Sequence, residues 1–241
     1  MNQQTLASMK TMKFTGMSAL YESVLELPID KQPSSHQLVA QLIDAEYLYR
    51  QDKRMNMYLR LSKMRYAASL LDVRYSQQRN LTKEKLTPFF DSNYINRAEN
   101  IAICGATGCG KSFLACALGH QACVNGQRTM YLNMNRFIEQ IALARVDGSI
   151  IKWMNRIAKT HLLILDDFGL QSLSKEIKLI LLQIMEDRYG KKSTIICSQL
   201  PIKKWYEYLD EPTLADAILD RFLHKVHRFE LKGKSMRKKE I

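Results

Sequence analysis

The stretch Gly105-Ala106-Thr107-Gly108-Cys109-Gly110-Lys111-Ser112 decides the fold of this chain. It fits the Walker A pattern, in which a glycine and four free residues are followed by Gly-Lys-Ser or Gly-Lys-Thr. Apolar residues 101–104 before it predict a short buried strand, and residues 113–122 after it predict a helix. Because the pattern requires a strand, a glycine-rich loop and a helix in this order, the sequence predicts a phosphate-binding loop in an α/β domain.

The residue types of this loop suit a nucleoside triphosphate with Mg²⁺. Its glycines allow backbone conformations closed to residues with a Cβ, so successive N–H groups can point at phosphate oxygens. We expect Lys111 to reach the β- and γ-phosphates and the Ser112 hydroxyl to ligate Mg²⁺, beside the positive end of the helix dipole. The predicted cofactor contacts are Gly105, Ala106, Thr107, Gly108, Cys109, Gly110, Lys111, Ser112 and Phe113.

The composition is that of a globular protein. Of the 241 residues, 46% are hydrophobic and 25% are charged, which is ordinary for a chain with one large core and a smaller appendage. No apolar run approaches the ~18 residues of a membrane span. The polar start at residues 1–5 also lacks the layout of a signal peptide. We therefore expect a cytoplasmic protein without membrane contact.

The net charge indicates a polyanionic partner. The chain has 36 Lys and Arg against 24 Asp and Glu, a formal net charge of +12, which favours nucleic acid over an acidic small molecule.

The five cysteines are scattered and include no Cys-x-x-Cys pair. This pattern is typical of reduced thiols that pack as small hydrophobes, rather than of a disulfide framework or a zinc site.

Residues 1–90 are expected to be wholly helical and to form a DNA-binding or oligomerisation region. Prolines at 28 and 33 interrupt the helical pattern, and Ser35 is a suitable N-cap for the next helix. Pro88 and the cluster at 89–93 mark the boundary to a second domain, residues 91–241. Tyr94, just ahead of the first strand, lies where an adenine ring could pack, although an ordinary linker contact fits the sequence equally well.

The segment 50–85 is strongly basic, with ten basic and three acidic residues and interleaved tyrosines. Its cations could displace counterions from a DNA backbone, or they could be a solvated face while the tyrosines pack in a small bundle. A predicted helix at 149–159 raises the same two alternatives. The candidates for DNA contact are Arg50, Lys53, Arg54, Arg60, Lys63, Arg65, Arg74, Arg79, Lys152 and Arg156.

Further strands are predicted at 128–133, 162–165, 193–198 and 225–231, which would complete a five-stranded parallel sheet. The strand at 162–165 is aliphatic throughout and is followed by Asp166 and Asp167, at the edge where open α/β sheets bind ligands. We expect Asp166 to hold Mg²⁺ and Asp167 to orient or deprotonate the attacking water. Gln199 follows the strand at 193–198, within reach of the γ-phosphate if that strand neighbours the first.

With these pieces in place, the sequence resembles AAA+ ATPases, and more closely the IstB family of transposition helper ATPases, relatives of the DnaC-type helicase loaders. The resemblance runs from about residue 10 to the end. It is carried by Gly105 to Ser112, by the segments 162–169 and 198–201, and above all by 212–221 and 230–237. It implies ATP-dependent binding of duplex DNA, a homo-oligomer and cooperation with the transposase of the same element. It also places Gln199 at sensor 1 and Arg221 at the arginine finger, against the alternative of a salt bridge for Arg221 within its own helix.

Two departures from the AAA+ pattern carry expectations. Asp167 stands where a glutamate is usual and is one methylene shorter, so hydrolysis is expected to be slow, and stimulated by DNA or a partner. Only 20 residues follow Arg221, too few for the usual helical lid, so a neighbouring subunit is expected to cover the nucleotide.

The favoured function is an ATP-dependent, DNA-binding helper that directs insertion-sequence transposition and is released by hydrolysis. The alternatives are a helicase loader acting on single strands and an architectural DNA-binding protein that uses ATP only to join subunits.

Overall fold

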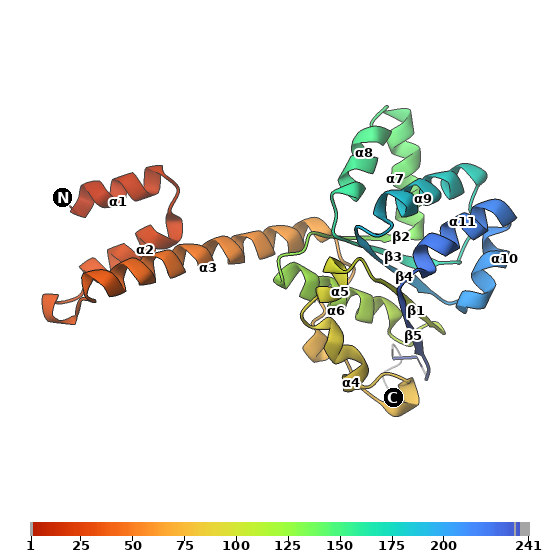
Figure 1. Ribbon diagram of the computed structural model, residues 1–241, viewed down its shortest axis with the longest axis horizontal. Helices are drawn as coiled ribbons and strands as arrows, with labels where there is room; N and C mark the ends of the chain where they lie inside the picture. The colour runs from red at the N-terminus through yellow and green to blue at the C-terminus, as the bar shows by residue number, and fades with distance from the viewer. Residues whose placement is uncertain (1, 234, 237–241) are drawn as a thin grey trace. The chain divides into compact units, whose positions relative to one another are not determined.

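The computed structural model describes residues 2–233 and 235–236 (Figure 1). Two compact units divide the chain, Met1–Met57 and Tyr58–Ile241. The division lies well before the boundary near residue 90 that the sequence analysis placed, because residues 58–90 pack against the sheet. Ala68, Leu81 and Leu86 are buried in one hydrophobic cluster with Ile101 and Ile103 of the first strand.

The first unit is built from helices α1 (Asn2–Thr11), α2 (Thr15–Leu25) and most of α3 (Ser35–Ser62), as far as Met57. Gly16 of α2 lies directly against α3, where a Cβ would overlap the Ala45 carbonyl. The buried carboxylate of Glu46 accepts hydrogen bonds from the N–H groups of Gly16 (2.7 Å) and Met17 (3.2 Å). Arg50 donates to the same carboxylate at 2.7 Å. Glu46 thus satisfies the first N–H groups of α2, which have no partner within that helix.

The long helix α3 ends at Ser62. The prediction that residues 1–90 are wholly helical is wrong for the segment 63–90. This segment consists of short elements: η2 (Leu70–Asp72), η3 (Gln77–Arg79), α4 (Lys83–Leu86) and η4 (Thr87–Phe89). An isolated antiparallel bridge joins Ser76 to Leu81. Tertiary packing decides this structure, since the apolar residues of the segment are spread along the sheet rather than along one helix face.

The second unit contains the predicted five-stranded sheet, and all of its strand pairs are parallel. The strands follow the order β2-β3-β4-β1-β5. Their bounds are β1 (Asn100–Gly105), β2 (Thr129–Asn133), β3 (Leu162–Phe168), β4 (Ser193–Ser198) and β5 (Val226–Leu231). The buried side chain of Asn100, at the start of β1, connects this strand to its neighbours. Its Nδ2 donates to the carbonyl of Phe222, and its Oδ1 accepts from the N–H of Thr194 on β4, both at 2.8 Å.

Helices cover both faces of this sheet (Figure 1). One face packs against α7 (Met134–Val146), α8 (Ile150–Ala158), α9 (Lys175–Arg188), η5 (Ile202–Lys204), α10 (Trp205–Leu209) and α11 (Pro212–Leu223). The other packs against α5 (Asn93–Asn96), α6 (Lys111–Val124) and residues 66–90. All five cysteines are buried with free thiols. This arrangement leaves the carboxyl ends of β1, β3 and β4 adjacent, where the predicted loop and acidic residues lie.

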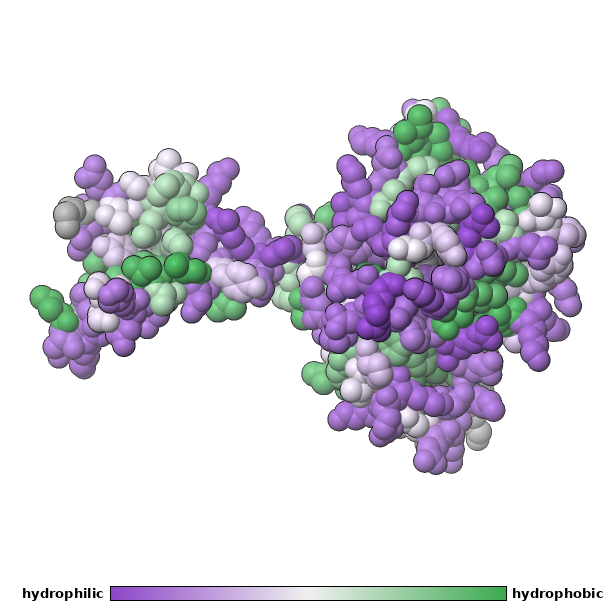
Figure 2. Space-filling view, in the orientation of Figure 1, coloured by the Kyte–Doolittle hydropathy of each residue, from purple (hydrophilic) through white to green (hydrophobic). Residues whose placement is uncertain are grey.

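Hydrophilic residues cover most of the visible surface of the second unit, with smaller hydrophobic patches between them (Figure 2). Within residues 2–233 and 235–236, no helix has both the length and the apolar character needed to cross a membrane.

Candidate nucleotide site

The Walker A loop connects β1 to α6, as predicted. Gly105, Gly108 and Gly110 have φ angles of +151°, +82° and +94°, which residues with a Cβ rarely adopt. A Cβ on Gly105 would also overlap the carbonyl of Leu231 on β5. Because α6 begins immediately after Gly110, its first N–H groups lie at the end of the loop. This geometry suits phosphate binding.

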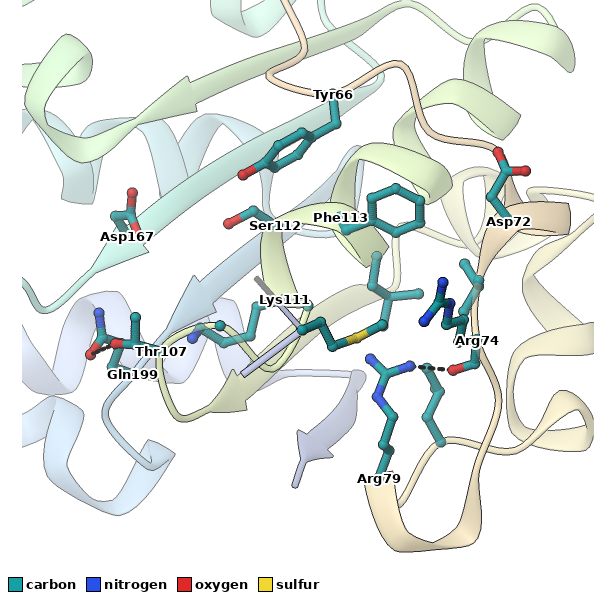
Figure 3. A pocket seen from close by; sticks show the side chains of 16 residues that line it. Tyr66, Asp72, Arg74, Arg79, Thr107, Lys111, Ser112, Phe113, Asp167 and Gln199 are labelled. Carbon is teal, nitrogen blue, oxygen red and sulfur yellow. Dashed lines mark hydrogen bonds between the residues drawn. The ribbon is translucent and has the colours of Figure 1, made fainter. Parts of the chain in front are cut away.

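Lys111 is 6% exposed, and its side chain folds back along the loop (Figure 3). Its Nζ donates hydrogen bonds to the carbonyls of Gly105 (2.8 Å) and Ala106 (2.9 Å). The ammonium group is therefore fixed at the loop, where it can meet phosphate oxygens.

A bulge separates the two acidic residues after the aliphatic part of β3. Between the paired residues Leu165–Ile196 and Phe168–Ser198, β3 contains one residue more than β4. Asp167 adopts φ +62° in this bulge and lines the cavity at the loop, whereas Asp166 is fully buried. A bulge redirects a side chain in this way, so that adjacent carboxylates face different surroundings.

The buried carboxylate of Asp166 is held by two hydrogen bonds. Its Oδ2 accepts from the Tyr131 hydroxyl at 2.6 Å, and its Oδ1 accepts from the N–H of Asp167 at 2.9 Å. Burial, followed by the charge of Asp166, raises the pKa of Tyr131, so this tyrosine remains a donor. Sequence reasoning missed Tyr131, because nothing in its local pattern shows that β2 lies beside β3.

Gln199 follows β4, and β4 does lie beside β1, which was the condition for placing Gln199 near the loop. The Thr107 hydroxyl donates to Gln199 Oε1 at 2.8 Å, and both residues line the cavity (Figure 3). The strand order places β4 between β3 and β1, so Gln199 and the two acidic residues share one end of the sheet.

The cavity at the loop has a volume of about 390 Å³. Beside the phosphate loop, its lining includes Tyr66, Val73, Leu81, Phe113 and Met236, which make this part largely apolar. Tyr94, considered for an adenine contact, does not line the cavity; it is buried with its ring 5.4 Å from that of Phe89. Residues 66–81 supply three of the five apolar lining residues instead.

Two segments meet at the loop, one from near the beginning of the second unit's sequence and one from near its end. Arg79 donates from Nη2 to Cys109 O at 2.9 Å and from Nη1 to the carbonyl of Arg74. The N–H of Met236 donates to Gly108 O at 2.9 Å, and the N–H of Lys232 donates to Arg79 O at 3.1 Å. Lys232 and Met236 thus join the last described residues of the chain to Arg79 and to the loop.

Three of the DNA-contact candidates lie at the cavity instead of on an open helix face. Arg65 places Nη1 3.6 Å from Asp167 Oδ2, and Arg74 and Arg79 line the cavity. A fourth, Arg50, pairs with Glu46. The others, exposed on α3, just after it or on α8, are Lys53, Arg54, Arg60, Lys63, Lys152 and Arg156.

Arg221 lies on α11 and does not line this cavity in its own chain. Its guanidinium forms an ion pair with Glu186 of α9 rather than with an acidic residue of its own helix. Nη1 also donates to Ala217 O at 2.9 Å, while the buried Nε has no hydrogen-bond partner among the described residues.

The donor set fits a nucleoside triphosphate with Mg²⁺. The loop supplies backbone N–H groups, and the Lys111 ammonium lies against it. The cavity beside the loop is partly apolar. A serine hydroxyl at Ser112 and carboxylate oxygens at Asp166 are the hard oxygen ligands that Mg²⁺ prefers.

Comparison with known proteins identifies the family. The model of the family described as IstB-like ATP binding protein matches residues 7–241. An insertion sequence ATP-binding protein of Sinorhizobium fredii (strain NBRC 101917 / NGR234) is 39% identical over 236 residues, which cover 98% of this chain and 96% of the relative.

Solved structures share the fold. The crystal structure of DnaI has a TM-score of 0.59 and 17% identity, covering 73% of this chain and 94% of that chain. The replication initiator DnaA bound to AMPPCP and single-stranded DNA has a TM-score of 0.57 and 20% identity, covering 71% of this chain and 52% of that chain. With the family match, the strand order and the Walker A loop, these findings show that the chain belongs to the IstB-like ATP-binding protein family and is an ATPase with the AAA+ fold.

Proposed function

We propose that this ATPase is the DNA-binding helper of a transposase, which assembles on duplex DNA with ATP and is released by hydrolysis. The observation that carries the proposal is the full-length similarity to an insertion sequence ATP-binding protein. The net charge of +12 supports an anionic partner, and the cavity at the Walker A loop supports control by nucleotide.

The residues of the site have distinct roles in this proposal. The loop N–H groups and Lys111 bind the β- and γ-phosphates, and the apolar part of the cavity receives the base. Ser112 and Asp166 hold Mg²⁺, which when bound neutralises charge on the phosphates. Asp167 orients the attacking water and takes up its proton, and Gln199 is positioned by Thr107 to contact the γ-phosphate.

Arg221 acts on the nucleotide of a neighbouring subunit. Its place outside the cavity of its own chain supports this role, since a finger residue reaches a pocket from across a subunit boundary. Its ion pair with Glu186 then holds the guanidinium until a neighbour binds.

The test measures duplex DNA affinity and oligomer size with ATP, without nucleotide, and in the variant Lys111→Ala. ATP should strengthen DNA binding and enlarge the oligomer in the unmodified protein, and Lys111→Ala should lose both responses. Lys191→Ala, which removes an exposed lysine of the same unit, is the matched control. A protein that stays monomeric and binds DNA equally with and without ATP would contradict the proposal.

A helicase loader is the second candidate, because DnaI and the DnaC helicase loader share this fold. Competition between single-stranded and duplex DNA separates the two functions. A preference for single strands, with no stimulation of a transposase, would favour the loader. DNA-dependent assembly with ATP but no phosphate release would favour the third candidate, an architectural protein that uses ATP to join subunits.

A further inference from the structure

A second hollow of the Tyr58–Ile241 unit lies along the outer edge of the sheet. Its volume is about 210 Å³, and residues 129–132 of β2 form one wall. We call this hollow the edge pocket. Because β2 is the outermost strand beside β3, one row of its backbone groups has no partner within the sheet.

Four cations surround the edge pocket, and each comes from a different part of the chain. Lys63 follows α3, Arg128 precedes β2, Arg136 lies in the first turn of α7, and Arg156 lies on α8. Among the residues that the structure describes, no aspartate or glutamate lines the pocket. Within the described residues, none of the four cations forms an ion pair, so the pocket gathers positive charge that the protein itself does not neutralise.

Arg156 is fixed at this pocket by its neighbours. Its Nη2 donates to Gln140 Oε1 at 3.3 Å, and the same oxygen accepts from the indole of Trp153 at 2.9 Å. Trp153 is buried against Phe137, with ring centroids 5.7 Å apart. The hydrogen bond to Gln140 thus links the guanidinium to the buried Trp153 and places Arg156 at the edge pocket.

We propose that the edge pocket binds backbone phosphates of duplex DNA, an inference that rests on the proposed DNA-binding function. Guanidinium groups match phosphate geometry through paired N–H donors, and clustered like charges are relieved when an anion binds. Exposed Lys152 on α8 and Lys159, the residue that follows this helix, lie at helical spacing from Arg156, which extends the positive row beyond a single phosphate. An extended anion fits this row better than a free phosphate ion.

This assignment differs from the expectation based on the basic segment. Of the ten candidates, only Lys63 and Arg156 line the edge pocket, while Arg128 and Arg136 come from outside the predicted set. The basic face of α3 is then not required to supply the main DNA contacts.

The test uses the full-length triple variant Lys63→Gln, Arg136→Gln, Arg156→Gln and a fluorescent duplex DNA, titrated over a range of salt concentrations with ATP present. Affinity should fall at least about tenfold near physiological salt, and the slope of log K against log salt should decrease by about 0.9 for each lost phosphate contact. The matched control removes three exposed lysines elsewhere, Lys31→Gln, Lys203→Gln, Lys204→Gln, and should change both quantities much less.

Several outcomes separate this inference from the proposed function. If the unmodified protein binds DNA and the two triple variants lose affinity equally, bulk charge explains binding and the edge pocket is overturned. If the unmodified protein does not bind DNA with or without ATP, the proposed function fails and the inference fails with it. If unlabelled single-stranded DNA displaces the fluorescent duplex from the unmodified protein and excess unlabelled duplex does not, a site for duplex DNA is likewise overturned.

A cross-linking measurement keeps the inference testable if the triple variant is unstable. A photoreactive residue at position 61, an exposed position that lines the edge pocket, should cross-link to duplex DNA and leaves the four cations in place. The same residue at exposed position 206 is the control and should not. Cross-linking at 206 but not at 61, in a protein that binds DNA, would overturn the edge pocket.

Discussion

The Tyr131 hydroxyl donates a 2.6 Å hydrogen bond to Asp166 Oδ2, which ties edge strand β2 to the carboxylate proposed to hold Mg²⁺. Both groups are buried, so each satisfies a polar atom that water does not reach. The bond fixes the carboxylate orientation before any ligand arrives.

Tyr131→Phe should lower the free energy of unfolding by about 1–3 kcal/mol, because a buried acceptor loses its partner. It should also raise the Mg²⁺ concentration needed for ATP binding, since Asp166 keeps only one of the two hydrogen bonds that orient its carboxylate. Urea unfolding and nucleotide titration at several Mg²⁺ concentrations measure the two effects. Tyr206→Phe is the control, because Tyr206 is 41% exposed. Loss of stability with an unchanged Mg²⁺ requirement would contradict the role given to the bond.

Arg65→Ala should raise basal ATP hydrolysis about 1.5- to 5-fold. The Arg65 guanidinium lies 3.6 Å from Asp167 Oδ2, in a pair of partly exposed side chains worth ~0.2–1 kcal/mol, and its removal leaves Asp167 freer to orient water. Steady-state phosphate release at saturating ATP without DNA measures the rate, with Lys191→Ala as the control. A lower rate at unchanged ATP affinity would show that Arg65 supports catalysis instead of restraining Asp167.

Arg221→Ala should reduce ATP hydrolysis by ~10³-fold or more while leaving ATP binding largely intact, if Arg221 acts across a subunit boundary. Mixing this variant with Lys111→Ala should restore part of the activity, because Arg221 of one copy can then face an intact loop of the other. Glu186→Gln keeps the arginine and removes only its ion pair, so it separates the catalytic effect from the structural one. Failure of the mixture to recover activity, although the two variants assemble, would remove Arg221 from the reaction.

Glu99 should make stability depend on pH. Arg97 donates to its carboxylate at 2.8 and 3.0 Å, and His227 lies 2.8 Å away. The hydrogen bonds from Arg97 outweigh burial and, with His227, lower the pKa of Glu99 from 4.5 to about 2. Because the folded pKa lies below the unfolded one, the stabilisation is fully present above pH 4.5 and is lost as the pH falls toward 2.

Glu99→Gln should therefore cost about 1 kcal/mol at neutral pH and progressively less as the pH approaches 2. Urea unfolding of both proteins across this range measures the difference. Glu207→Gln, at an exposed glutamate without an ion pair among the described residues, should show no such convergence. An equal cost at every pH would mean that Glu99 acts through packing rather than through its charge.

Much of the fold was predictable because its signals are local. The buried strands before and after the Walker A loop are runs of aliphatic residues, and the loop itself combines three glycines with Lys111 and Ser112. Asp166 and Gln199 were expected near the loop because the carboxyl ends of adjacent parallel strands meet at one edge. The strand order, with β4 between β1 and β3, agrees with that reasoning.

The segment 63–90 was not predictable in the same way. Leu70, Leu81, Leu86 and Phe89 are buried in one cluster with residues of β1 and α6, whereas Leu71 is exposed. A basic sequence with interleaved tyrosines does not show which residues turn toward the sheet. The same packing brings Arg65 to Asp167 and lines the cavity with Arg74 and Arg79, all of which the sequence offered equally as DNA contacts.

The amino-acid sequence by itself determined the phosphate loop, the five strands and the acidic residues that follow β3, because residue type and short spacing fix these features. Only the tertiary structure decided which cations line the cavity at the Walker A loop and which gather at the edge of β2. Those contacts join segments far apart in the chain, so they depend on strand order and core packing rather than on any local pattern.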